Sequence, residues 1–457
     1  MNEYEHFLEN KKHTSIDFGI KPIFIPENMF DYQKFICEKM INKGRHAGFI
    51  DTGLGKTLIE IVTATNYVRS LNKRCLIITP LAVAFQFIKE SEKFGIDDIE
   101  YSKDGKFTKK IVVCNYERLD KFNHSDFECV ILDESSILKN FNGAIKEQIT
   151  IFVRKVKYRY LFTATPSPND YIELGTSSEA LGYLGYTDML TRFFANNENN
   201  IRPQDIGNKF YLKPHAKDNF FNWVRSWSVS MRKPSDLGFD DTKFILPELK
   251  INQHQVKNDK NWVEEGQILL FGKIAKRLSE VREEQKMTIE NRCNKAVELS
   301  NMHDTSVYWC NFNDEGDLLN TLDKNAYQIK GSMNIDKKEE LLLAFANGEI
   351  NKLITKPSIT CFGLNWQHCN HTVYFPTFSY EQYYQAIRRF WRFGQKREVT
   401  CDMVFSDGQK RVIDTLFVKS DKAQELFSEL SSNVNSDYKI KTREFNKEVI
   451  LPKFLNK

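Results

Sequence analysis

The stretch Asp51-Thr52-Gly53-Leu54-Gly55-Lys56-Thr57 decides the fold that we expect for the first part of this chain. The apolar run at 47–50 comes directly before it and is typical of a buried parallel strand. Behind it, apolar residues recur at helical spacing through Leu58, Ile61, Val62 and Val68. A glycine-rich turn that ends in Lys-Thr between a strand and a helix predicts a phosphate-binding loop.

This loop sequence also predicts how a nucleotide is held. Glycines let backbone N–H groups turn toward bound phosphates, and the N-terminus of the following helix adds partial positive charge. Lys56 is expected to reach the β- and γ-phosphates, and the Thr57 hydroxyl is expected to bind Mg²⁺. The other nucleotide-binding positions of the loop are Thr52, Gly53, Leu54 and Gly55. The alternative is an ordinary strand-to-helix turn, since Ile50 stands where the strict pattern has glycine.

Composition narrows the class of protein. A chain of 457 residues with 41% hydrophobic residues is long enough for roughly three domains with real cores. The net charge of +4 is small, so any nucleic-acid surface must be local. We find no apolar run of bilayer length and no signal-peptide core. Nine scattered cysteines without a C-x-x-C pair indicate reduced thiols in a cytoplasmic protein, not zinc or disulfides.

Strands and helices alternate through residues 1–170, which predicts an α/β domain with a parallel sheet. One strand, at 130–132, is followed by adjacent carboxylates. Asp133 is expected to hold the Mg²⁺ shell, and Glu134 to orient and deprotonate the attacking water. Upstream of the loop, Gln33 can hydrogen-bond an adenine edge as both donor and acceptor, or it is a surface glutamine.

Residues 171–300 break this rhythm and are expected to form a largely helical insertion. Its Trp223, Arg225 and Trp227 either contact nucleic acid or pack against the core domains, and tryptophans are more often packed. The alternation resumes over 301–432, which predicts a second α/β domain, and 433–457 form a charged tail.

A helix is expected over 379–395, stopping near Gly394. Arg389 and Arg392 are three residues apart and would share a helical face. Paired arginines from a second domain can neutralise the charge that develops on a γ-phosphate during phosphoryl transfer. The alternative is a solvated basic face.

With these elements in order, the chain resembles the superfamily-two helicases, and within them the Swi/Snf-related translocases. The resemblance rests on residues that match the motifs of that family in sequence order. They are Gln33; 51–57; Thr79, Pro80 and Gln86; Asp133 and Glu134 with Leu138, Lys139 and Asn140; 163–166; 362–367; and Gln385, Arg389, Arg392, Gly394 and Gln395. Ser135-Ser136 depart from the usual Ala-His, which leaves the metal and base roles intact.

The resemblance implies two RecA-like parallel-sheet domains in tandem and an ATP- and Mg²⁺-dependent motor. It implies catalytic roles for Lys56, Glu134, Gln385, Arg389 and Arg392. It assigns nucleic-acid or coupling contacts to Thr79, Pro80, Thr163, Thr165, Gly363 and Asn365.

The implied partner is DNA, with duplex favoured, together with protein partners in replication, recombination or packaging; no membrane role is expected. The sequence of residues 366–369 and the compact size of the chain resemble the short helicases of this family found in bacteriophages, which would act in the host bacterial cytoplasm. Two alternatives are an ATP-switched DNA clamp or loading factor that does not move, and an RNA helicase.

Overall fold

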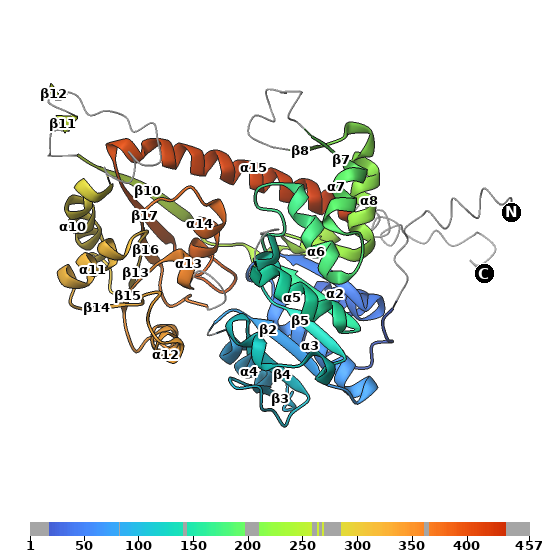
Figure 1. The fold of residues 1–457 in the computed structure, drawn as a ribbon. Helices are drawn as coiled ribbons and strands as arrows, with labels where there is room; N and C mark the ends of the chain where they lie inside the picture. The colour runs from blue at the N-terminus through green and yellow to red at the C-terminus, as the bar shows by residue number, and fades with distance from the viewer. Residues whose placement is uncertain are drawn as a thin grey trace, which may run out of the picture. The chain divides into compact units, whose positions relative to one another are not determined.

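The computed structural model describes residues 18–81, 83–139, 144–196, 210–257, 263–264, 267–268, 285–360 and 365–435. The chain divides into two compact units. The first consists of residues 1–77, 123–244 and 425–457, and the second of residues 78–122 and 245–424. Figure 1 labels the helices and strands, and we use its labels below.

A seven-stranded sheet follows the order β3-β4-β2-β5-β6-β1-β9. The strand pairs β1–β6, β1–β9, β3–β4 and β5–β6 are parallel. Its strands are short and mostly buried, as the apolar runs predict. Their bounds are β1 Arg45–Ile50, β2 Cys75–Thr79, β3 Ile99–Tyr101, β4 Ile111–Asn115, β5 Cys129–Leu132, β6 Tyr158–Thr163 and β9 Ser228–Met231.

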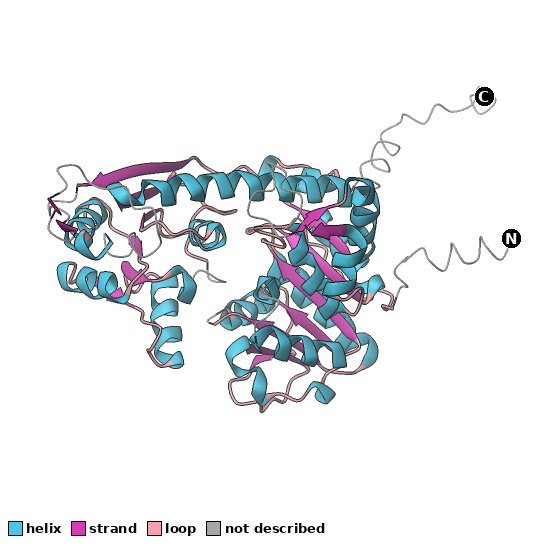
Figure 2. Cartoon of the chain, turned by 45° about the horizontal axis from the view of Figure 1, so that its top comes forward, coloured by secondary structure: helices cyan, strands magenta, loops and turns pink. Residues whose placement is uncertain are grey.

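Helices connect these strands, and Figure 2 shows helices alongside the magenta strands of this sheet. They are α2 Asp31–Lys43, α3 Lys56–Leu71, α4 Ala84–Lys93 and α5 Ala144–Lys155. In α3 the residues from Leu58 to Val68 are all buried, which makes this helix part of the core. The α/β organisation expected for the first domain is therefore confirmed.

The stretch 171–300 is mainly helical where it is described, and it also supplies strands. Its β9 pairs in parallel with β1, and β10 belongs to the other large sheet. The elements are α6 Leu174–Leu181, α7 Tyr186–Phe193, α8 Lys217–Trp227, α10 Ile289–Ser300, β7 Phe194–Asn196, β8 Phe210–Leu212, β10 Leu249–Val256, β11 Val263–Glu264 and β12 Gln267–Ile268.

Trp223 and Trp227 of α8 are buried and pack against each other at 5.3 Å between ring centroids. Trp227 also makes an edge-to-face contact with Phe49 of β1. The packing alternative is therefore confirmed for both tryptophans, because buried rings cannot present a face to a base. Arg225 on the same helix is partly exposed.

A six-stranded sheet follows the order β10-β17-β16-β13-β15-β14, and all its strand pairs are parallel. Trp309, Trp366 and Phe390 lie in its main core cluster. The strands are β13 Ser306–Trp309, β14 Ala326–Gln328, β15 Lys352–Thr355, β16 His371–Tyr374 and β17 Val399–Ser406. The helices are α11 Asn313–Leu322, α12 Ile335–Ala346, α13 Pro357–Thr360, α14 Tyr380–Ile387 and α15 Lys410–Val434. The expected second parallel-sheet domain is confirmed.

The helix that we expected over 379–395 is shorter, because α14 ends at Ile387. Beyond it, the N–H groups of Arg389 and Phe390 bond carbonyls three residues back, which tightens the chain into turns. The backbone carbonyl of Arg389 then accepts a hydrogen bond from the N–H of Trp366 at 3.1 Å. Arg389 and Arg392 therefore lie in a turn segment and not on one helical face.

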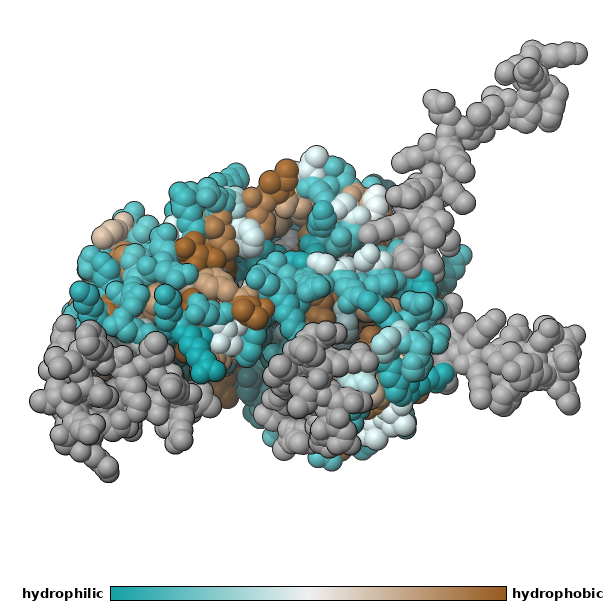
Figure 3. Space-filling model, turned by 90° about the horizontal axis from the view of Figure 1, so that it is seen from above, coloured by the Kyte–Doolittle hydropathy of each residue, from teal (hydrophilic) through white to brown (hydrophobic). Residues whose placement is uncertain are grey.

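The face seen in Figure 3 is largely hydrophilic, with brown residues in small groups. Exposed large apolar residues such as Ile245 and Val418 are scattered through the described chain. Among the described helices, none has the length and apolar character needed to cross a bilayer.

Candidate active site

The phosphate-binding loop lies between β1 and α3, where the sequence predicts it. Gly53 and Gly55 have φ angles of 84° and 76°, in the left-handed region that favours glycine. A Cβ on Gly55 would also collide with the side-chain amide nitrogen of Gln33. Gly55 is thus required both by its backbone conformation and by the close approach of Gln33.

Gln33 supports this loop from α2. It is buried, and its Nε2 donates to the carbonyl of Leu54 at 3.2 Å. Its Oε1 accepts from the N–H of Phe30 at 3.0 Å. The Tyr32 hydroxyl donates to the same Leu54 carbonyl at 3.1 Å. Gln33 therefore lies directly against the loop, while its predicted contact with adenine stays a prediction.

Lys56 and Thr57 open α3 and are only partly buried. Lys56 Nζ donates to the carbonyl of Ile50 at 3.1 Å, so its ammonium group lies back over the loop. At the start of the loop, Asp51 Oδ1 accepts from the N–H of Thr52 at 2.6 Å. The N–H of Asp51 bonds the Met231 carbonyl at 2.9 Å, which ties the loop to the end of β9. This geometry leaves the helix N-terminus and the lysine at one end of α3, as phosphate binding requires.

Asp133 and Glu134 follow β5 directly, and both are buried. Glu134 has a φ angle of 54°, which is uncommon for a residue other than glycine and typical of functional sites. The hydroxyl of Thr163, at the end of β6, lies 3.5 Å from Glu134 Oε2. The same hydroxyl accepts from the N–H of Thr165 at 3.0 Å. Two predicted motifs are thus in contact through Thr163.

Glu60 is a residue of this site that our sequence reasoning missed. It lies one helical turn after Lys56 on α3, and it is completely buried. Neither carboxylate oxygen has a hydrogen-bond partner among the described residues. Burial raises the pKa of Glu60 well above the ordinary value; Asp133 adds to the rise and Lys56 opposes it. A lone glutamate inside the apolar run Leu58-Ile59-Glu60-Ile61-Val62 is the sequence signal that could have identified it.

Ser135 and Ser136, which replace the Ala-His usual in the family motif, are also buried. Their hydroxyl groups have no hydrogen-bond partner in the part of the chain that the structure describes. A buried hydroxyl without a hydrogen bond costs free energy. After Glu60, the two serines directly following Glu134 are therefore a second position where a ligand or water is expected.

In the second unit, a turn holds the predicted arginines. Arg389 is buried and Arg392 is partly exposed. The amide nitrogen of Gln395 donates to the carbonyls of Gln367, Cys369 and Phe390 at 3.0, 3.3 and 3.3 Å. Gln395 therefore fixes the turn from inside, which explains its burial.

The neighbours of these arginines divide into structural and candidate functional residues. Arg388 lies with its guanidinium 5.1 Å from the ring centroid of Trp391 and donates to the Trp391 carbonyl. Gln385 is buried, and its Nε2 lacks a partner among the described residues. Asn365 is exposed, whereas Gly363 lies outside the described residues, as do Asn140 and Leu364.

Thr79 and Pro80 end β2 and begin the loop after it. Their carbonyls lie 3.5 and 3.1 Å from the side-chain amide nitrogen of Asn115, at the end of β4. Thr79 is fully buried, so its side chain belongs to the interior in this conformation. The nucleic-acid contact predicted for these two residues stays a prediction.

Family models match both halves of the chain. A DEAD/DEAH box helicase model matches residues 30–174, and a helicase conserved C-terminal domain model matches residues 265–394. The chain belongs to the superfamily-two helicases. No curated protein matches it. These domains imply an ATP-hydrolysing helicase, and the family typically uses Mg²⁺.

Two solved structures of Saccharomyces cerevisiae Dbp5 support the fold. A variant of Saccharomyces cerevisiae Dbp5 bound to RNA and ADP BeF3 aligns with a TM-score of 0.55 and 11% identity, over 88% of this chain and 93% of that one. A second Dbp5 structure with RNA and ADP BeF3 gives 0.55 and 12% over 87% and 93%. The Sulfolobus solfataricus SWI2/SNF2 ATPase core in complex with dsDNA gives 0.40 and 18% over 95% and 99%.

The residues at the loop suit an Mg²⁺–nucleotide. Hydroxyl and carboxylate oxygens are the ligands that Mg²⁺ prefers, and the site offers Thr57 and Asp133. Three buried acidic side chains, Glu60, Asp133 and Glu134, gather there. Such a concentration of acidic groups inside a protein fits a bound cation.

Proposed function

We propose that this helicase is a Swi/Snf-like motor that couples Mg²⁺–ATP hydrolysis to movement along DNA, with duplex DNA as its preferred track. The observation that carries the proposal is the contact between Thr163 and Glu134. Through this contact, Glu134, which we assign to activation of the attacking water, touches the motif that the family uses to couple ATP hydrolysis to movement. The sequence pairs Lys139-Asn140 and Gly394-Gln395 support the Swi/Snf-like assignment over an RNA helicase.

The chemistry follows from the residues. Lys56 and the N-terminus of α3 bind the phosphates, and Thr57 and Asp133 hold the Mg²⁺. Held there, Mg²⁺ would neutralise charge on the phosphate oxygens. Glu134 accepts the proton of the attacking water, and its buried position keeps the carboxylate away from bulk solvent. Arg389 and Arg392 supply positive charge to the γ-phosphate in the transition state, and Gln385 lies on the helix before them.

We assign nucleic-acid contacts or the coupling of hydrolysis to movement to Thr79, Pro80, Thr163, Thr165, Gly363 and Asn365. Contacts of this kind go to backbone phosphates, so binding should depend little on base sequence and fall steeply as salt rises. Because Trp223 and Trp227 are buried, base stacking by these two tryptophans is not part of the proposal.

Displacement of the third strand from a DNA triplex tests the proposal. A motor that tracks duplex DNA removes that strand only while ATP is hydrolysed. Glu134→Gln, which should bind ATP without turnover, is the matched control and should leave the triplex intact. ATP-dependent DNA binding without strand displacement would instead identify an ATP-switched clamp. Displacement of a strand from an RNA substrate but not from DNA would identify an RNA helicase.

A further inference from the structure

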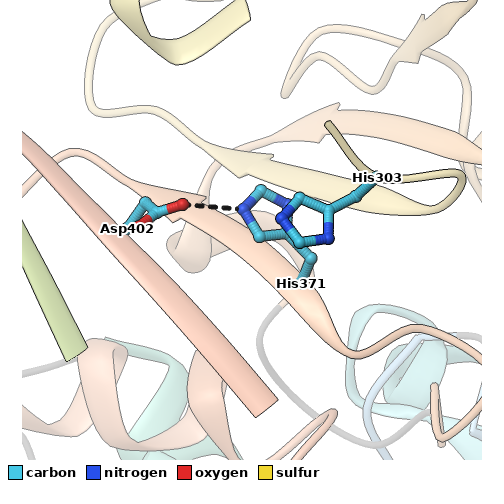
Figure 4. Close-up of side chains that lie close together, drawn as sticks. All are labelled: His303, His371 and Asp402. Carbon is cyan, nitrogen blue, oxygen red and sulfur yellow. Dashed lines mark hydrogen bonds and ion pairs between the residues drawn. The ribbon is translucent and has the colours of Figure 1, made fainter. Parts of the chain in front are cut away.

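Three titratable side chains gather at the second sheet, outside the residues assigned to ATP. His371 is the first residue of β16, Asp402 lies on β17, and His303 lies in the loop between α10 and β13. Figure 4 shows the two imidazole rings stacked, with Asp402 directed at His371. One candidate ligand atom from each of the three residues lies within 4.8 Å of the others.

The contacts within this cluster are short and specific. His371 Nε2 lies 2.9 Å from Asp402 Oδ2, and His371 Nδ1 lies 2.8 Å from the Ser306 hydroxyl. The rings of His303 and His371 are nearly parallel, at 9° and 3.7 Å between centroids. His371 and Asp402 are buried, whereas His303 is partly exposed. The cluster therefore combines a fixed interior pair with one imidazole that can be reached from solvent.

Side chains of β10 contact the other oxygen of the Asp402 carboxylate. Asp402 Oδ1 accepts from Asn252 Nδ2 and lies 2.9 Å from His254 Nε2. Burial disfavours the charged form of Asp402, but hydrogen bonds from His371, Asn252 and His254 outweigh it and hold the carboxyl pKa well below its ordinary value. Asp402 is thus a buried carboxylate with two imidazoles against its oxygens and a third stacked on one of them.

We propose that His303, His371 and Asp402 form a binding site for a divalent transition-metal ion such as Zn²⁺, with His254 as a fourth ligand. Imidazole nitrogen with carboxylate oxygen is a donor set that Zn²⁺ accepts and that Mg²⁺ disfavours. Ser306 suits the role of an outer partner, because its hydroxyl can accept a hydrogen bond from the Nδ1–H of His371, which leaves Nε2 for the ion.

The interior pair of His371 and Asp402 already has nearly the spacing of two ligands on one ion. Two ligand atoms about 2.0 Å from a tetrahedral ion are about 3.3 Å apart, close to the 2.9 Å between His371 Nε2 and Asp402 Oδ2. His303 has to turn, since parallel stacked rings cannot both aim a nitrogen at one ion. Its loop position and partial exposure allow that rotation and give the ion a route of entry.

The location indicates what the ion would do. Ser306 and His371 begin their strands, so the cluster lies at the amino ends of these parallel strands. The loops of α/β sheets that bind substrates lie at the opposite, carboxyl ends. An ion here would tie β10, β16, β17 and the His303 loop together, and so would stabilise the second unit.

Calorimetric titration of the full chain with Zn²⁺ in the absence of nucleotide tests the site, with thermal unfolding as a second readout. We expect one saturable Zn²⁺ per chain and a higher Tm, while equal Mg²⁺ produces neither. His303→Ala should weaken Zn²⁺ binding at least about tenfold and abolish the Tm increase. Exchange of Co²⁺ for Zn²⁺ should give the visible absorption of a tetrahedral site.

The matched control is His215→Ala, which removes an exposed imidazole in the first unit and should bind Zn²⁺ like the parent. His254→Ala, at a partly exposed position, serves as a second variant that should weaken binding and keep the fold. Unchanged Zn²⁺ affinity in both His303→Ala and His254→Ala would overturn the proposal. An absence of saturable binding in the parent would overturn it equally, and the cluster would then be a hydrogen-bond network of the core.

Discussion

Two completely buried glutamates, one in each unit, show opposite ways of keeping an acidic group inside a protein. Glu315 of the second unit accepts from Arg292 Nη1 at 2.6 Å and from the N–H groups of Asn311 and Phe312 at 2.7 and 3.0 Å. Glu60 of the first unit has no hydrogen-bond partner among the described residues. The paired group serves the structure, whereas the unpaired one lies beside Asp133 and Lys56, where ligand chemistry is expected.

The same contrast holds for the two sheets. Both are parallel and connected by helices, yet their buried polar groups are used differently. In the first unit, Glu60 of α3 and the two serines after β5, Ser135 and Ser136, lack hydrogen-bond partners among the described residues. In the second unit, Arg292 of α10 pairs with Glu315 of α11, and Asp402 of β17 pairs with His371 of β16. Buried groups without a partner among the described residues also occur in the second unit, for example at Gln385. What marks Glu60 as a candidate site residue is therefore its position beside Asp133 and Lys56 together with its missing partner.

The largest effect should come from Lys56→Ala. We expect ATP turnover to be lost while the protein stays folded, because the bound phosphates lose their cation. Steady-state ATPase assays and circular dichroism check this, with the exposed Lys73→Ala as control. Turnover near the parental rate in Lys56→Ala would remove the phosphate-binding role of the loop.

Glu134→Gln should keep ATP binding and lower hydrolysis by orders of magnitude, since the attacking water loses its base. Nucleotide affinity and single-turnover hydrolysis, measured on the same variant, separate the two effects. If affinity falls and hydrolysis of bound ATP does not, Glu134 is a metal ligand or a structural residue.

Arg389→Ala and Arg392→Ala should lower turnover far more than nucleotide affinity. Their charge is assigned to the transition state, and arginines of this kind contribute about 10³ to 10⁵ in rate. Arg388→Ala is the matched control, because Arg388 is stacked on Trp391 and should affect stability instead. If ATP affinity falls while turnover stays intact, these arginines bind ATP in the ground state and do not act in the transition state.

Neutralising the two buried glutamates tests the contrast between the paired Glu315 and the unpaired Glu60 directly. Glu315→Gln leaves Arg292 without its charged partner and should destabilise the second unit by about 3–5 kcal/mol. Burial raises the pKa of Glu60 and so already favours its neutral form, and Glu60→Gln should therefore leave the free energy of unfolding close to the parental value. Urea unfolding of both variants measures this, and equal destabilisation would remove the distinction.

Much of this arrangement follows from the sequence. The loop at 51–57 and the pair Asp133-Glu134 are local patterns, each following an apolar strand, and both lie where the sequence predicts them. Their context is contained within a few residues, so periodicity and turn chemistry suffice. The conformation expected for the arginine segment is wrong, because its turns depend on hydrogen bonds from Trp366 and Gln395 that helical spacing does not reveal.

What the sequence did not reveal depends on contacts between distant residues. Glu60 interrupts an apolar run in the sequence, but its complete burial beside Asp133 is known only from the packed structure. His303, His371 and Asp402 are far apart in the chain and meet only because β13, β16 and β17 are neighbours in one sheet. Sequence spacing indicated no metal cluster, since no spacing rule describes ligands brought together by strand order.

The most direct test of the central claim is the ATPase rate of the full chain without nucleic acid and with single-stranded DNA, duplex DNA or RNA. A DNA motor should hydrolyse ATP fastest with duplex DNA at low salt, and lose that stimulation as salt rises. An ATPase rate that is the same in all four conditions, and insensitive to salt, would leave the fold in place and contradict the motor.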